Sequence, residues 1–193
     1  MRVLSLLALL LSLHGCSSMQ PAAPRVWLDE RTAVMVTAQS RPAVLAREEQ
    51  MRAINVRDYA QIGAVETNRM GAHHLYLVLL FWSTIDRSPA EHEWIAANFS
   101  RITLHADDRP IELTRAAVTR EELGFGLRPF AHPTPGTGEA YFAVTRSDLQ
   151  SIALSRTLTL TARGNADTPE RYSEWQDGRR GLAAFLAQLP TAR

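Results

Sequence analysis

The chain has 193 residues, enough for one domain of ordinary size, and its 46% hydrophobic and 21% charged residues exclude a disordered, collagen-like or coiled-coil protein. The net charge of +1 provides no basic surface of the kind that nucleic-acid binding requires. All 21 basic residues are arginine, which excludes a P-loop lysine, a Schiff-base lysine and a Ser–Lys dyad, and the single cysteine excludes an internal disulfide and a cysteine-based zinc site.

The beginning of the chain has the pattern of a targeting segment. Arg2 supplies a short positive region, and residues 3–13 are apolar apart from two serines. This run is too short to span a bilayer, which takes about 20 residues, but it has the length of a signal-peptide core. The run ends in the segment Leu13-His14-Gly15-Cys16, which holds the one cysteine of the chain.

That segment resembles the lipobox of bacterial lipoproteins, in which an aliphatic, a variable and a small residue precede an invariant cysteine. His14 stands at the second place, where a small residue is usual. The resemblance implies that the thiol of Cys16 receives a diacylglyceryl group, that residues 1–15 are cleaved off as a signal peptide, and that the new α-amine is acylated with a fatty acid such as palmitate. Ser17 resembles the outer-membrane class of these lipoproteins, so we expect an outer-membrane anchor that faces the periplasm.

Residues 16–24 are expected to form a lipidated tether, and residues 25–193 a single β-rich periplasmic domain. The tether sequence after Cys16, SSMQPAAP, is small, polar and proline-containing. Its eight residues reach at most about 26–29 Å when extended. The domain should therefore lie close to the membrane, which is its first expected partner.

The first half of the domain has mostly period-two patterning. It predicts strands at residues 26–28, 33–37, 59–66 and 74–82, with turns at 29–32 and 68–71. Residues 74–82 are apolar on both alternating faces, so this strand is expected to be central in its sheet and buried on both sides. Ser88, Pro89 and Glu91 then predict a helix that runs to about Asn98, with Ser88 as N-cap and a capping box.

The second half continues with strands, one helix and a long loop. It predicts strands at 102–105, 111–114, 140–144 and 157–162, a turn at 107–110, a Gly- and Pro-rich loop at 121–138 and a short helix at 146–153. Ser147 and Gln150 have the spacing of a capping box for that helix.

The last segment predicts an amphipathic helix. Its apolar stripe consists of Leu182, Phe185, Leu186 and Leu189, with Asp177 as the expected N-cap and Pro190 as terminator. A lone helix of this length is marginal in water, so the stripe is expected to dock on the protein's own sheet. Tyr172 and Trp175, just upstream, are expected to hold the helix in place.

These elements together predict the fold class. About seven to nine short strands joined by turns favour a mainly-β, sandwich-like domain of two layers, with two short helices and the C-terminal amphipathic helix.

The sequence provides no strong catalytic or metal-binding motif, so no catalytic residue, metal or cofactor is predicted. His73 and His74 are adjacent, which directs them to opposite faces of a strand, and Glu91-His92-Glu93 lacks the second histidine of a zinc helix. No G-x-S-x-G segment is present. The best candidate for recognition is the long loop, with Phe125, Arg128, Phe130 and His132, because binding residues collect on loops of rigid β scaffolds.

We therefore expect a non-catalytic binding or assembly role in the periplasm, with a possible envelope protein as partner and no nucleic acid. Two alternatives stay open: a lipid-anchored, metal-dependent hydrolase, and a carrier with a small ligand in a β cavity. The hydrolase requires two histidines and a carboxylate within about 4 Å of each other in a cleft. The carrier requires a large pocket lined by aromatic residues.

Overall fold

The computed structural model describes residues 23–48, 56–116, 119–163 and 169–190, so the predicted signal segment, Cys16 and most of the tether lie outside the described residues. The elements are β1 (Arg25–Asp29), β2 (Val34–Ala38), β3 (Ala43–Glu48), β4 (Arg57–Arg69), β5 (Ala72–Ser83), α2 (Pro89–Asn98), β6 (Arg101–Ala106), β7 (Arg109–Thr114), β8 (Gly138–Ala143), α3 (Arg146–Leu154), β9 (Leu158–Ala162), β10 (Glu170–Gln176) and α4 (Arg179–Gln188).

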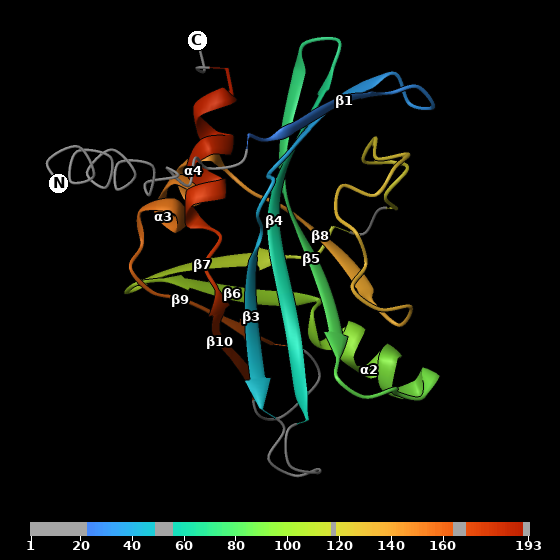
Figure 1. Cartoon of the computed structure of the whole chain (residues 1–193), viewed down its shortest axis with the longest axis vertical. Helices are drawn as coiled ribbons and strands as arrows, with labels where there is room; N and C mark the ends of the chain where they lie inside the picture. Colours follow the sequence, from blue (N-terminus) through green and yellow to red (C-terminus); the bar gives the residue numbers. More distant parts are fainter. Residues whose placement is uncertain (1–22, 49–55, 117–118, 164–168, 191–193) are drawn as a thin grey trace, which may run out of the picture.

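The strands form one antiparallel sheet with the long β4–β5 hairpin at its centre (Figure 1). The second edge of β5 pairs with β8, whereas the second edge of β4 pairs with β3 along its first half and with β2 along its last residues. From β3 the sheet continues through β10, β9, β6 and β7. It curls until its two ends meet at a bridge between Arg115 and Phe142.

The mainly-β class, with two short helices and a C-terminal helix, is therefore confirmed. The two predicted layers are parts of one curled sheet rather than two separate sheets, because the long β4–β5 hairpin belongs to both. Two of its strands, β3 and β10, were not among those expected from the sequence.

Gln39 lies where the chain passes from β2 to β3 along the same edge of β4. The buried side chain takes the place of a backbone partner, because its Oε1 accepts a hydrogen bond from the N–H of Ala64 at 3.0 Å. Its Nε2 donates to the carbonyls of Arg41 at 2.6 Å and Gly178 at 2.9 Å. One side chain thus joins β4 to the residue that precedes α4.

The central strand β5 is buried on both faces over its middle, as predicted. Leu77, Leu79 and Phe81 belong to an inner core inside the curl, and Val78 and Leu80 to an outer core on the opposite face. This arrangement explains why the segment is apolar at every position.

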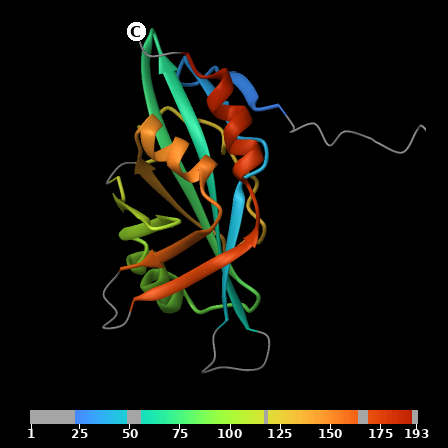
Figure 2. The same ribbon diagram turned by 90° about the vertical axis from the view of Figure 1, so that its left-hand side faces the viewer.

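The inner core is completed by the three helices, which lie on the concave side of the sheet (Figure 2). They contribute Ile95 from α2, Phe99 just after it, Leu149 and Ile152 from α3, and Leu182, Phe185 and Leu186 from α4. Leu189 is buried directly after α4. The C-terminal stripe therefore docks on the protein itself, as predicted, and α3 lies beside α4.

The outer core is covered by the β1–β2 hairpin and by the predicted long loop. Phe125 and Phe130 of the loop are buried there, and the ring of Phe130 lies over Gly63, where a Cβ atom would be 2.3 Å from the ring. Asp29 holds the loop to the hairpin, because its carboxylate accepts a hydrogen bond from the N–H of Leu127 at 2.9 Å.

The observed helix caps agree with the caps predicted from the sequence for α2 and differ from them for α3 and α4. Ser88 and Glu91 form the predicted capping box of α2. The predicted box of α3 is wrong, because Thr145 and Asp148, two residues earlier, make it. The N-cap of α4 is Gly178 and not Asp177, whose Oδ1 instead accepts from the N–H of Arg179 at 2.8 Å.

Candidate functional site

The loop residues predicted for recognition divide between core and surface. Phe125 and Phe130 are buried in the outer core, so their rings serve packing. Arg128 is more than half exposed, and its Nε lies 3.9 Å from the carboxylate of Glu139, which His132 approaches to 3.7 Å. A binding role for this loop stays a prediction, and it would rest on the two basic side chains.

The histidines in the described part of the chain do not assemble the centre that a metal-dependent hydrolase requires. Among the described residues, no group of three or more His, Cys, Asp or Glu side chains is placed to hold a metal ion. His73 pairs with a single carboxylate, that of Glu66, at 2.8 Å.

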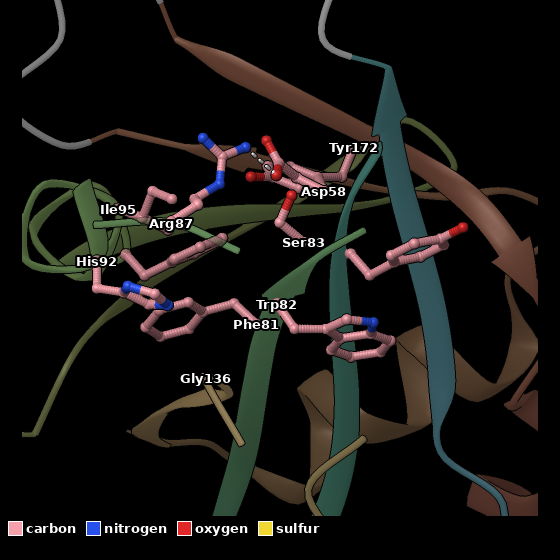
Figure 3. Close-up of a pocket in the computed structure, with 11 residues that line it drawn as sticks. Asp58, Phe81, Trp82, Ser83, Arg87, His92, Ile95, Gly136 and Tyr172 are labelled. Carbon is pink, nitrogen blue, oxygen red and sulfur yellow. Dashed lines mark hydrogen bonds and ion pairs between the residues drawn. The ribbon is translucent and has the colours of Figure 1, made fainter. Parts of the chain in front are cut away.

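A small pocket lies between β4, β5 and α2 (Figure 3). Its volume of about 10 Å³ holds roughly one water molecule, which is too little for the ligand of a carrier. Ser83, His92 and Asp58 line it, but each is engaged elsewhere. The Ser83 hydroxyl donates to the carbonyl of Arg57, the His92 ring bonds to the carbonyl of Ser88, and the Asp58 carboxylate accepts from arginines.

A buried ion network occupies the wall of this pocket. Asp58, only 4% exposed, accepts hydrogen bonds from Arg47 at 2.7 Å and from Arg87. Arg47 also pairs with Glu170 at 2.9 Å. The network therefore links β3, β4, β10 and the segment before α2 at one end of the sheet.

The electrostatics of the network follow from burial and charge. Burial raises the pKa of Glu170, against the opposing effect of Arg47. Burial disfavours the charged form of Arg47, but Tyr172, Glu170 and Asp58 outweigh it, and the pKa of Arg47 is raised. Burial also raises the pKa of Tyr172, whose hydroxyl faces Glu170. The carboxylates of Asp58 and Glu170 are both paired with arginine, which favours a structural role for the network.

The outer face of the same end carries an aromatic cluster. Tyr59 stacks on Trp82 with ring centres 5.2 Å apart and meets the edge of Trp175 at 6.2 Å. The guanidinium of Arg57 lies 4.8 Å from the Trp175 ring centre. In the strand register Ala46 of β3 lies between Tyr59 of β4 and Ser173 of β10. Its small side chain leaves room for the contact between Tyr59 and Trp175.

Trp175 points outward and is 58% exposed, so the prediction that it holds α4 is wrong. Tyr172 alone of the two upstream aromatics lies in the inner core with the helix. The two side chains separate because they lie on opposite faces of β10.

Trp175 borders a groove of about 350 Å³ on this outer face. The groove is lined by the cross-strand pair Ala46 and Ser173 and by charged residues from three strands, Glu48, Arg57, Arg171 and Glu174. Arg57 pairs with Glu48 at 2.9 Å and Glu174 with Arg179 at 2.7 Å. Arg171 is exposed and forms no ion pair with another described residue. The groove thus combines a half-exposed indole with a guanidinium that no described residue compensates.

Sequence reasoning missed this groove because it missed β10. The signal was present in Glu170–Gln176, where Glu170 and Tyr172 alternate with Arg171, Ser173 and Trp175. This period of two separates a buried face from an outer face that carries a tryptophan.

Comparison of the chain with protein-family models, with curated proteins and with solved structures finds no match. Within the described residues, no helix has both the length and the apolar character needed to cross a membrane.

Proposed function

We propose that this protein is a lipid-anchored component of the bacterial envelope, held at the outer membrane through Cys16, whose periplasmic domain has a non-catalytic binding role. The anchor rests on the lipobox-like segment Leu13-His14-Gly15-Cys16. The observation that carries the binding role is the outer groove, where Trp175 and Arg171 stand together on a rigid sheet.

The chemistry of the groove favours an acidic sugar as ligand. An exposed indole offers a flat apolar face against which the C–H face of a sugar ring packs. Arginine presents a planar fork of donors that matches a carboxylate. The groove volume of about 350 Å³ lies within the range of about 300–1,000 Å³ that small-ligand sites occupy. An acidic unit of an envelope glycan meets both requirements.

The ionisable groups of the groove support binding rather than catalysis. The guanidinium groups of Arg57 and Arg171 are hydrogen-bond donors that offer no acceptor, so they do not serve as general bases. Glu48 and Glu174 are held in ion pairs with arginines. A general acid or base in this groove would need a carboxylate released from its pair.

The test compares two disaccharides that differ in one carboxylate. The full mature protein in detergent is titrated calorimetrically with N-acetylglucosaminyl-N-acetylmuramic acid, which is acidic, and with neutral diacetylchitobiose. We expect tighter binding of the acidic sugar. Trp175→Ala should weaken binding of both about tenfold or more, and Arg171→Gln should remove the preference for the acidic one.

The matched control is Trp94→Ala, which removes another exposed tryptophan, 47% accessible on α2 and outside the groove. It should bind like the wild type. If neither disaccharide binds, or if the Trp175 and Trp94 variants behave alike, the groove is not a glycan site.

A further inference from the structure

Exposed apolar side chains gather at one end of the molecule. Of the eight large hydrophobic residues that are exposed in the described part of the chain, five lie on the β1–β2 hairpin or beside it. They are Val26, Leu28, Met35, Met70 and Leu127, and we call the first four of them the hairpin patch.

The strand register places the members of the hairpin patch near one another. Val26 and Leu28 point to the same side of β1, and Leu28 is directly opposite Met35 in β2. Met35 is opposite Asn68, two residues before Met70 in the β4–β5 turn. Leu127 lies toward the other face of the hairpin, because its N–H donates to Asp29, which alternates with Leu28 along β1. Val26, Leu28 and Met35 therefore share one face of the hairpin, with Met70 beyond them, unlike singly exposed apolar residues, which need no explanation.

Basic residues flank the patch. Arg31 lies in the β1–β2 turn and Arg69 at the end of β4, both are exposed, and neither forms an ion pair with another described residue. Glu30 is the acidic neighbour in the first turn, and the field of Arg31 reaches Glu121. The rim of the patch thus offers two exposed guanidinium groups that no described carboxylate pairs with, and such groups suit an anionic surface.

The patch begins on β1, the first strand after Cys16 in the sequence. β1 begins at Arg25, nine positions after Cys16, and the eight residues between them span at most about 26–29 Å. β1 and the β4–β5 turn lie at one end of the long axis in Figure 1, whereas the end of β3 and the start of β4, which border the groove, lie at the other.

We propose that the hairpin patch docks on the lipid bilayer in which Cys16 is anchored, a proposal that rests on the lipidation proposed above. The short tether holds the patch at high local concentration next to the lipid surface, so weak apolar insertion suffices. Val26, Leu28 and Met35 enter the boundary between headgroups and acyl chains, and Arg31 and Arg69 contact anionic headgroups. This docking directs the groove at Trp175 away from the membrane.

The test uses the full lipidated protein in vesicles of phosphatidylethanolamine and phosphatidylglycerol. With Cys16 acylated, a cysteine introduced by Leu28→Cys is the one free thiol, and it is labelled with the fluorophore NBD. We expect a blue-shifted emission and a loss of about half of the fluorescence when nitroxide-labelled acyl chains are included. Ala90→Cys, an exposed position on α2 at the opposite end, is the matched control and should be quenched by aqueous iodide instead.

The outcomes separate the two proposals. Protein that does not float with the vesicles and carries no acyl group on Cys16 overturns the anchor. Protein that floats, but whose label at position 28 is as accessible to iodide as the label at position 90, overturns docking and leaves the anchor standing. A blue shift that grows with protein density and is insensitive to the nitroxide shows that a second copy covers the patch, and it also overturns docking on lipid.

Discussion

At the scale of single residues, buried polar side chains hold the loops of the fold to neighbouring strands by hydrogen bonds to the backbone. Asp29 is the clearest case, because its carboxylate is 2% exposed and accepts hydrogen bonds from the N–H groups of Arg31, Thr32 and Leu127. Burial disfavours its charged form, but these donors outweigh burial and lower the pKa of Asp29 below its usual 3.8. The charged form is thus the one that stabilises the hairpin and the loop.

We expect Asp29→Ala to lower the free energy of unfolding by about 1–3 kcal/mol at neutral pH, because buried N–H groups lose their acceptor. Since the folded pKa lies below the unfolded value of 3.8, the contribution is present above that value and is lost as the pH falls through the folded pKa. Urea unfolding from pH 7 to pH 3 measures this. Glu30→Ala, at the exposed neighbour, should change little, and an identical acid limb for wild type and Asp29→Ala would contradict the assignment.

At the scale of elements, α4 shows how a short helix is stabilised by docking. Phe185 is fully buried, between Leu182 and Leu186 on the same face. Gly181 allows a close approach, because a Cβ atom there would be 2.7 Å from the carbonyl oxygen of Arg41. The helix has no side-chain hydrogen bond at its N-cap, so its stability comes from packing.

Phe185→Ala should therefore cost about 3–5 kcal/mol through lost burial and a residual cavity. Thermal unfolding of the mature protein measures the effect as a lower midpoint. Gln188→Ala, an exposed position in the same helix, is the control and should leave the midpoint unchanged. Equal midpoints for all three proteins would mean that the docked helix contributes nothing to stability.

At the scale of the whole molecule, the proposals divide the domain into two ends. The hairpin patch on β1 and β2 lies at one end, and the groove at Trp175 lies toward the other. The ion network of Arg47, Asp58 and Glu170 holds the strands of the groove end together. If the proposed anchor and docking hold, this arrangement directs the groove at Trp175 away from the lipid.

The proposed lipid anchor predicts the fate of a Cys16→Ser variant. Without the thiol no diacylglyceryl group is attached, so residues 1–15 should stay on the chain and the protein should leave the outer-membrane fraction. Cells grown with labelled palmitate measure the incorporation, and Ser17→Ala should be labelled like the wild type. Equal labelling of wild type and Cys16→Ser would disprove the anchor.

Local sequence signals predicted those elements whose stabilising contacts are close in the chain. The capping box of Ser88 and Glu91 and the apolar stripe of α4 both use residues within a few positions of each other. The β6–β7 hairpin is likewise joined by a short turn. Residues 77–81 of β5 were predictable for a related reason, since a strand buried on both faces is apolar at every position.

The candidate site was not predictable in this way, because its parts come from distant segments. β3 and β10 pair although Ala46 and Ser173 lie far apart in sequence, and the alternating pattern of β10 does not indicate which strand it pairs with. The contact of Tyr59 with Trp82 and Trp175 depends on that pairing. The same holds for Phe125 and Phe130, since nothing in their own loop indicates that a sheet face lies beneath them.

By itself, the sequence determined the mainly-β class, the central strand, the helix at residues 89–98 and the amphipathic C-terminal helix, because each depends on the periodicity or caps of one continuous segment. Only the tertiary structure decided that the strands curl into one sheet, that Trp175 faces outward, and that Arg171 and Trp175 share a groove. These features follow from strand pairing between distant segments, whose free energy comes from the burial of both partners together and leaves little trace in either segment alone.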